Sequence, residues 1–179
     1  MEPLYAALVR RLSAWKPEDL AVLRAGWCSF NLDEYLGLPA ADPRSYRRFM
    51  AEQLGDPLQI PDAALRLPDG SATDGDGAAA AYGAALTRSG GIGVQLLGLG
   101  SNGHVGFNEP PCDADLPCRV VSLSRATRQQ NAAMFGGDPA AVPSSAITLG
   151  LPEILAAEEI HLVVTGAAKA TILRRLLEA

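Results

Sequence analysis

Apolar and polar residues follow two different periods along this chain, and the two periods alternate. Leu4, Leu8 and Leu12 are spaced as on one face of a helix, which predicts a helix over residues 3–14. Residues 27–32 instead alternate between apolar and polar, as in a strand. Further helices are predicted over residues 43–54, 77–89 and 152–157, from Ser124 onward, and over 166–178. Further strands are predicted over residues 65–67, 92–97, 119–123, 146–149 and 159–164.

Strands and helices that alternate in this way are typical of α/β proteins. We expect a single three-layer domain, with a mostly parallel open sheet and helices on both faces (Rossmann-like). The chain has 179 residues, of which 48% are apolar, and these numbers suit one domain with a real core. We find no internal repeat and no linker between domains.

Charge and hydropathy exclude several classes of partner. The net charge of −5 argues against general binding to nucleic acid, although a small anion can still be held by a few local donors. No signal peptide is recognised, and no apolar run reaches the roughly 20 residues needed to cross a membrane. We therefore expect a cytoplasmic protein without a membrane partner. Cys28 is expected to be a buried thiol, and the spacing of Cys112 and Cys118 fits no common zinc site.

The segment 98–110 carries the clearest chemistry. It follows the predicted strand 92–97 and contains four glycines together with Asn102, His104 and Glu109. It is too rich in glycine for a helix, where each glycine costs about 1 kcal/mol, and too polar for the core. A loop at the end of a strand is where open α/β sheets bind ligands. This loop is therefore the candidate active site.

The same loop contains the dinucleotide-binding pattern Gly98-x-Gly100-x-x-Gly103. That pattern requires a helix directly after the third glycine. Gly106 and the pair Pro110-Pro111 prevent such a helix, so the match is weak evidence for a nicotinamide enzyme.

Asp33, His104 and the helix that begins near Gly166 are candidates from the residues alone. Asp33 ends a predicted strand, where it either caps the next turn or acts in proton transfer. His104 is either such a catalytic group or a structural histidine, whereas His161 lies in a strand pattern and is interpreted as structural. The helix that begins near Gly166, with Lys169 in its first turn, offers free N–H groups to a phosphate or carboxylate.

These segments together resemble the glucosamine-6-phosphate deaminases (isomerases). The string Asn-Gly-His-x-Gly-Phe-Asn-Glu-Pro is highly specific for that family, whereas the related 6-phosphogluconolactonases usually lack its Phe-Asn-Glu-Pro ending. The matching segments, in the order of the family, are residues 30–39, Ser45-Tyr46, Phe49-Met50, residues 98–110, Thr127-Arg128, Asn131 and Gly166-x-x-Lys169-Ala170.

The resemblance implies an enzyme, formally a hydrolase, that converts glucosamine 6-phosphate into fructose 6-phosphate and ammonia without a metal or organic cofactor. By analogy with the family, His104 opens the sugar ring with support from Asn102 and Glu109. Asp33 then moves the C2 proton to C1. The resemblance also assigns Lys169, Arg128 and Gly100 to binding of the sugar phosphate. A 6-phosphogluconolactonase and a non-catalytic sugar-phosphate-binding protein remain the alternatives.

The chain also departs from the family pattern. Asn102 stands where many members have aspartate, and it can hold His104 although it cannot relay a proton. Ala133 replaces an arginine that grips the phosphate in some members, and Val121 replaces a lysine of the allosterically regulated ones, so allosteric control is not expected. Relative to the family, the single domain over residues 1–179 lacks an N-terminal phosphate-loop unit and a C-terminal strand and helix. The sheet edges left unpaired favour marginal stability or a homo-oligomer.

Overall fold

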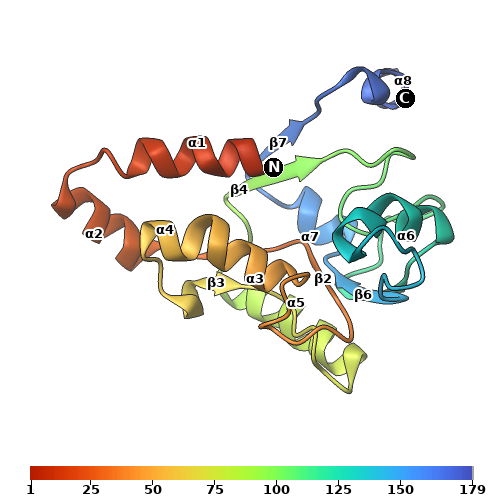
Figure 1. The fold of residues 1–179 in the computed structure, drawn as a ribbon, viewed down its shortest axis with the longest axis horizontal. Helices are drawn as coiled ribbons and strands as arrows, with labels where there is room; N and C mark the ends of the chain where they lie inside the picture. Colours follow the sequence, from red (N-terminus) through yellow and green to blue (C-terminus); the bar gives the residue numbers. More distant parts are fainter. Residues whose placement is uncertain (179) are drawn as a thin grey trace.

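The structure is a computed structural model that describes residues 1–178 (Figure 1). Its helices are α1 (Glu2–Leu12), α2 (Pro17–Gly26), α3 (Tyr46–Met50), α4 (Asp56–Leu58), α5 (Gly75–Arg88), α6 (Arg125–Asn131), α7 (Leu151–Leu155) and α8 (Ala170–Leu177). Its strands are β1 (Ser29–Phe30), β2 (Asp33–Tyr35), β3 (Leu65–Arg66), β4 (Val94–Gly98), β5 (Arg119–Ser122), β6 (Ser145–Thr148) and β7 (Glu159–Val163). A π-helical turn, η1 (Ala51–Gly55), joins α3 to α4, and short 3₁₀ segments η2 (Asp62–Ala64), η3 (Ala132–Phe135) and η4 (Ala167–Lys169) complete the order.

The α/β class predicted from the sequence is confirmed, and the strands pair in three separate groups. β1 pairs with β3 and β4 pairs with β7, in both cases parallel. The third group has the order β2-β6-β5, and both of its ladders are antiparallel. The pairing is therefore more mixed than the alternation of helices and strands implied.

Several predicted element boundaries were wrong for local reasons. The strand expected over 27–32 is divided, because the chain leaves β1 after Phe30 and enters another sheet at Asp33. The helix expected to start after Asp42 starts instead at Ser45, whose hydroxyl accepts the Arg48 N–H at 3.1 Å. It also continues through the π-turn to Leu58 rather than stopping at Gly55, and α2 was not anticipated at all. The serine cap predicted for α6 is confirmed, since the Ser124 hydroxyl accepts the Thr127 N–H at 3.1 Å.

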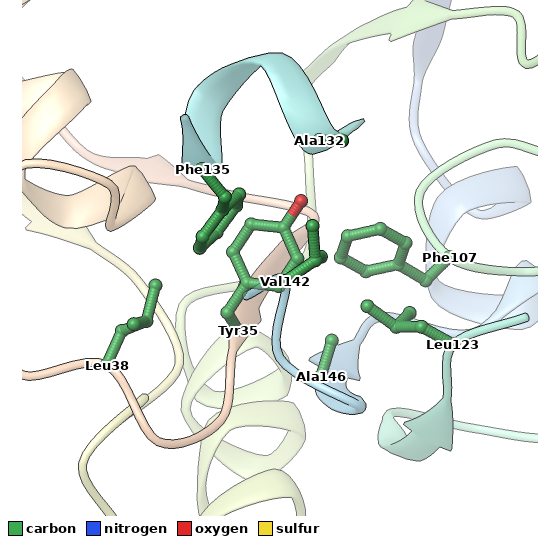
Figure 2. Packing of buried hydrophobic residues seen from close by; sticks show 8 residues of the cluster. All are labelled: Tyr35, Leu38, Phe107, Leu123, Ala132, Phe135, Val142 and Ala146. Atoms are coloured by element: carbon green, nitrogen blue, oxygen red, sulfur yellow. The ribbon is translucent and has the colours of Figure 1, made fainter. Parts of the chain in front are cut away.

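The core consists of three clusters of buried side chains. One surrounds Tyr35, which is fully buried and packs on Phe107 and Phe135 (Figure 2). Tyr46 packs on Tyr35 as well, and the three ring centroids lie 5.2–5.5 Å from that of Tyr35. The second cluster lies between α5 and β6, and the third joins α1 to α3 and α4. Because Phe107 belongs to the loop 98–110 and Tyr35 to β2, the first cluster fastens that loop to the β2–β6–β5 sheet.

The β4–β7 pair extends away from this core and carries α8 at its far end (Figure 1). β4 was expected to be buried, but only alternate residues are: Gln95 and Leu97 are buried, whereas Val94 is 60% exposed. Ile160 of β7 is exposed as well. Cys28, expected to be a buried thiol, is also exposed, because it lies beside a hollow and not inside the core. Within residues 1–178, no helix has the length and apolar character that a membrane span requires.

Candidate active site

Asp33 lies where the chain passes from one sheet to another. The Asn31 N–H donates to the Arg66 carbonyl of β3 at 2.9 Å, and the Leu32 carbonyl accepts the Leu149 N–H at 2.7 Å. Asp33 then opens β2, opposite Thr148 of β6. The prediction that Asp33 ends a strand was therefore wrong in detail, since it begins one. It does project from the break between two strands, where a side chain is not needed for core packing.

The surroundings of Asp33 favour its protonated form. Burial, together with a smaller contribution from the neighbouring Glu34, raises the pKa of its carboxyl to about 7. Glu34 itself is buried and accepts the backbone N–H groups of Tyr35, Tyr46 and Arg47 at 2.9, 3.1 and 2.9 Å. Glu34 thus fixes the start of α3, and burial raises the pKa of its carboxyl while these three backbone bonds lower it.

The loop 98–110 is tied to β6 and to Leu149 beside it by Phe107 and Asn108, two residues of the specific string to which the sequence analysis gave no role. The Asn108 side-chain amide donates to the carbonyls of Val105 and Leu149 at 3.0 and 2.9 Å, and it is buried. The Phe107 N–H donates to the Thr148 hydroxyl at 3.2 Å. Thr148 therefore stands between Asp33, its partner in the β ladder, and the loop.

Gly106 shows how closely the loop approaches Asp33. Its φ is +58°, a conformation that favours glycine. A Cβ placed there would lie 2.9 Å from the Thr148 hydroxyl and 3.4 Å from Oδ2 of Asp33. The carboxylate of Asp33 therefore lies against the loop, two residues from His104, as the expected convergence of Asp33 and the loop requires.

The orientation of His104 is set by Asn102 and Gly100. Nδ1 of His104 lies 2.6 Å from Oδ1 of Asn102, and because an amide oxygen only accepts, Nδ1 carries the proton. The neutral ring then has Nε2 as its acceptor. A Cβ on Gly100 would lie 2.4 Å from the ring, so the ring packs directly on the glycine backbone. Desolvation lowers the pKa of His104, Glu109 raises it, and Lys169 lowers it.

Glu109 was expected to orient the imidazole, but its hydrogen bonds lead elsewhere. Its carboxylate accepts the hydroxyl protons of Ser124, at 3.1 Å, and Thr127, at the start of α6. A carboxylate at a helix N-terminus is stabilised by the free N–H groups and the dipole there. Glu109 therefore acts on His104 through its charge, while Asn102 makes the hydrogen bond.

The two predicted anion-binding cations differ in their surroundings. Lys169 ends η4 and precedes α8, close enough for its charge to lower the pKa of His104. Arg128 is on α6, and its guanidinium donates to the carbonyls of Val142 and Ala140, both at 3.1 Å. These bonds show that Arg128 stabilises the segment that leads to β6.

The geometry suits proton transfer on a small molecule. A carboxyl whose pKa is near 7 and an imidazole with a lowered pKa exchange protons readily at neutral pH. Within residues 1–178, no three His, Cys, Asp or Glu side chains group so as to hold a metal ion. No helix follows Gly103 before β5, as the sequence predicted against the dinucleotide pattern.

Several known proteins are similar to this chain over most of its length. The chain is 47% identical over 150 residues to a glucosamine-6-phosphate deaminase of Cellvibrio japonicus, a match covering 84% of this chain and 57% of that protein. It is 43% identical over 176 residues to one of Streptomyces avermitilis, covering 98% and 66%. Against the structure of a monomeric glucosamine-6-phosphate deaminase, the TM-score is 0.86 at 33% identity, covering 99% of this chain and 71% of that one.

A second structural relative shares the fold alone. It is the 6-phosphogluconolactonase from Trypanosoma brucei, with a TM-score of 0.67 at 24% identity, covering 90% of this chain and 66% of that one. The chain spans 57% to 60% of the length of several curated relatives, which is less than two thirds. The family model described as glucosamine-6-phosphate isomerases/6-phosphogluconolactonase matches residues 2–179. The chain therefore belongs to the family of glucosamine-6-phosphate isomerases and 6-phosphogluconolactonases.

Proposed function

We propose that this chain carries the catalytic groups of a glucosamine-6-phosphate deaminase. The reaction takes glucosamine 6-phosphate and water to fructose 6-phosphate and ammonia. The observation that carries the proposal is the junction at Thr148, which is paired with Asp33 in the β ladder and bonded to the loop of His104. The relatives named as deaminases add support, since the match to the Streptomyces avermitilis protein covers 98% of this chain.

In the proposed mechanism, His104 acts first. Nε2 of the neutral ring accepts the proton of the sugar's anomeric hydroxyl, and the cationic ring returns a proton to the ring oxygen, which opens the pyranose. Asn102 holds the tautomer that makes Nε2 the acceptor. The negative charge of Glu109 stabilises the cation that forms between the two transfers.

Asp33 acts second, as the base that takes the C2 proton and returns it at C1. A base with a pKa near the working pH is both available and strong enough to act. The enolic intermediate between the two transfers carries its amino group on C2. Protonation at C1 gives a ketimine, and water then replaces the nitrogen and releases ammonia. Lys169 and the backbone at Gly100 are proposed to hold the phosphate and sugar oxygens, and Arg128 is proposed to support them through the Val142 segment.

Incubation with glucosamine 6-phosphate tests the proposal, with ammonia and fructose 6-phosphate as the readouts. Asp33→Asn is expected to stop exchange of the C2 proton in heavy water, followed by NMR. His104→Gln is expected to slow ring opening more than the later steps. Asp76→Asn and His161→Gln are matched controls, because both residues are exposed and lie outside the site.

The alternatives give different outcomes in the same experiment. Hydrolysis of 6-phosphogluconolactone that survives Asp33→Asn would identify a lactonase. Calorimetric binding of glucosamine 6-phosphate without turnover by the folded chain would identify a non-catalytic sugar-phosphate-binding protein. Equal and mild losses in Asp33→Asn and His104→Gln would contradict the two separate roles.

A further inference from the structure

His104 lies between two tight turns of its loop. The turn before it is closed by the N–H groups of Gly103 and Gly100, which donate to the carbonyls of Gly100 and His104 at 3.2 and 2.8 Å. The turn after it, residues 105–108, is closed by the N–H of its last residue, which donates to the carbonyl of its first at 3.2 Å. Because the backbone is closed into turns on both sides, the place of the imidazole depends on where the second turn is attached to the sheet.

Thr148 attaches this second turn to the sheet. Its side-chain oxygen accepts the Phe107 N–H at 3.2 Å, and its hydroxyl proton is donated to the Leu149 carbonyl at 3.2 Å. Thr148 and Phe107 are both buried, so solvent gives this N–H no ready substitute acceptor. The Phe107 ring also packs on Tyr35 (Figure 2), but apolar packing is not directional, whereas a hydrogen bond fixes the backbone at one position.

Thr148 is also the residue of β6 that lies directly opposite Asp33. Opposite residues of an antiparallel pair place their side chains on the same face of the sheet, with Cβ atoms about 5 Å apart. Both side chains reach Gly106, since a Cβ placed there would lie 2.9 Å from Oγ1 of Thr148 and 3.4 Å from Oδ2 of Asp33. One ladder pair and one side-chain hydrogen bond therefore connect Asp33 to the turn beside His104.

We propose that Thr148 is a positioning residue whose side-chain oxygen fixes the turn 105–108 and so sets the His104 imidazole relative to the Asp33 carboxyl. The proposal rests on the proposed function, in which one sugar must meet both groups in succession. Thr148 itself transfers no proton, because its hydroxyl is engaged on both sides, by the Phe107 N–H and the Leu149 carbonyl. A misplacement of about 1 Å costs about 100-fold in rate, so a displaced turn should slow the reaction more than it weakens binding.

Three variants separate the oxygen of Thr148 from its shape. Thr148→Val keeps the branched shape that suits a strand and removes the oxygen. Thr148→Ser keeps the oxygen and removes the methyl group. Ile147→Val is the matched control for a small change in β6, because Ile147 is the neighbouring residue, is equally buried and faces the other side of the sheet.

The first readout needs no enzymatic activity. Hydrogen exchange at the Phe107 amide is expected to become at least tenfold faster in Thr148→Val, because its acceptor is gone. In Thr148→Ser and Ile147→Val it is expected to stay within threefold of the unchanged protein. The NMR signals of the His104 ring are expected to broaden in Thr148→Val only, because the loosened turn lets the ring exchange between positions.

The second readout is turnover of glucosamine 6-phosphate at a temperature well below the melting point of every variant. In Thr148→Val, kcat is expected to fall at least tenfold while KM stays within twofold. Thr148→Ser is expected to keep kcat within threefold of the unchanged protein, because the acceptor oxygen is present. A purely structural role would lower the melting temperature without this separation of kcat from KM.

Failure of this proposal and failure of the proposed function give different results. A folded, unchanged protein without turnover would refute the function, and the Phe107 exchange and His104 signals would still decide the role of Thr148. Unchanged exchange and signals in Thr148→Val would overturn that role, as would an unchanged kcat. Equal losses in Thr148→Val and Ile147→Val would overturn it in favour of a general weakening of β6. A Thr148→Ser variant as slow as Thr148→Val would overturn it in favour of the methyl group.

Discussion

The two sheets that meet at the candidate site differ in how completely they are covered. In the β2–β6–β5 sheet, Tyr35, Ala146 and Ile147 have no measurable exposed surface, and helices and loops pack on both sides. In the β4–β7 pair, Val94, Ile160 and Val163 are exposed, and within residues 1–178 no helix of the fold buries them. The first sheet owes its stability to burial, whereas the second relies largely on its own backbone ladder.

This difference indicates which part of the candidate site is held least firmly. Asp33 belongs to the covered sheet, but the loop of His104 leaves β4 of the uncovered pair. Asn108 and Thr148 connect the two by hydrogen bonds. The distance between His104 and Asp33 therefore depends on how firmly these bonds hold the β4–β7 pair to the core.

Tyr35→Ala should cause the largest loss of stability and so give the sharpest contrast between the two sheets. It removes a fully buried ring from the centre of three aromatic contacts, and such changes cost about 3–5 kcal/mol of unfolding free energy. Ile160→Ala in β7, where the side chain is 41% exposed, should cost less than about 1 kcal/mol. Urea unfolding of both variants measures the difference, and similar costs would contradict the contrast between the sheets.

Asp33→Asn should make the protein more stable at high pH. Between about pH 4 and 7 the folded state binds more protons at Asp33 than the unfolded state, so the unfolding free energy falls as the pH rises. A shift from 3.8 to about 7, at about 1.4 kcal/mol per unit, sets an upper limit of about 4 kcal/mol. Thermal melts at pH 4 and pH 8 should show a gain only at pH 8, and a loss there would refute the burial of this charge.

Asn108→Ala should loosen the connection between the two regions. It removes one of the two donors to each of the carbonyls of Val105 and Leu149, which keep the Asn108 backbone N–H and the Thr148 hydroxyl. The expected cost is about 0.5–1.5 kcal/mol for each lost bond. Hydrogen exchange should rise across residues 98–110. Asn131→Ala is the matched control, because the Asn131 amide donates its hydrogen bond to the hydroxyl of Tyr35, which is on β2 and not on the loop. Equal exchange of the loop in both variants would show that Asn108 does not anchor it.

Lys169→Gln should have the smallest effect, a rise in the pKa of His104. Removal of a neighbouring positive charge favours the cationic ring, and Glu109→Gln should shift the pKa in the opposite direction. The chain has only two histidines, so NMR titration resolves His104 once His161→Gln assigns the other signal. Both shifts should shrink in high salt, because Lys169 and Glu109 are only half-buried and salt screens charges that solvent reaches.

Local patterns in the sequence predicted the elements that depend on neighbours along the chain. The cap at Ser124, the helix around residues 77–88 and the glycine-rich loop after β4 all follow from side chains within a few residues of each other. The candidates His104 and Glu109 also came from the sequence, through the specific string that contains them, and Asp33 came from its place at the end of a predicted strand. The roles of these residues remain proposals.

Other features depend on contacts between distant segments, which the sequence does not display. Thr148 lies in an ordinary strand pattern, and its position opposite Asp33 follows only from the register of β2 on β6. The exposure of Cys28 and the bonds of Glu109 to α6 likewise follow from which segments meet in space. The sequence by itself determined which chemical groups this protein has and which of them lie close together along the chain. Tertiary packing decided which of them are desolvated and within reach of one another, because burial and pairing arise only when separate segments come together.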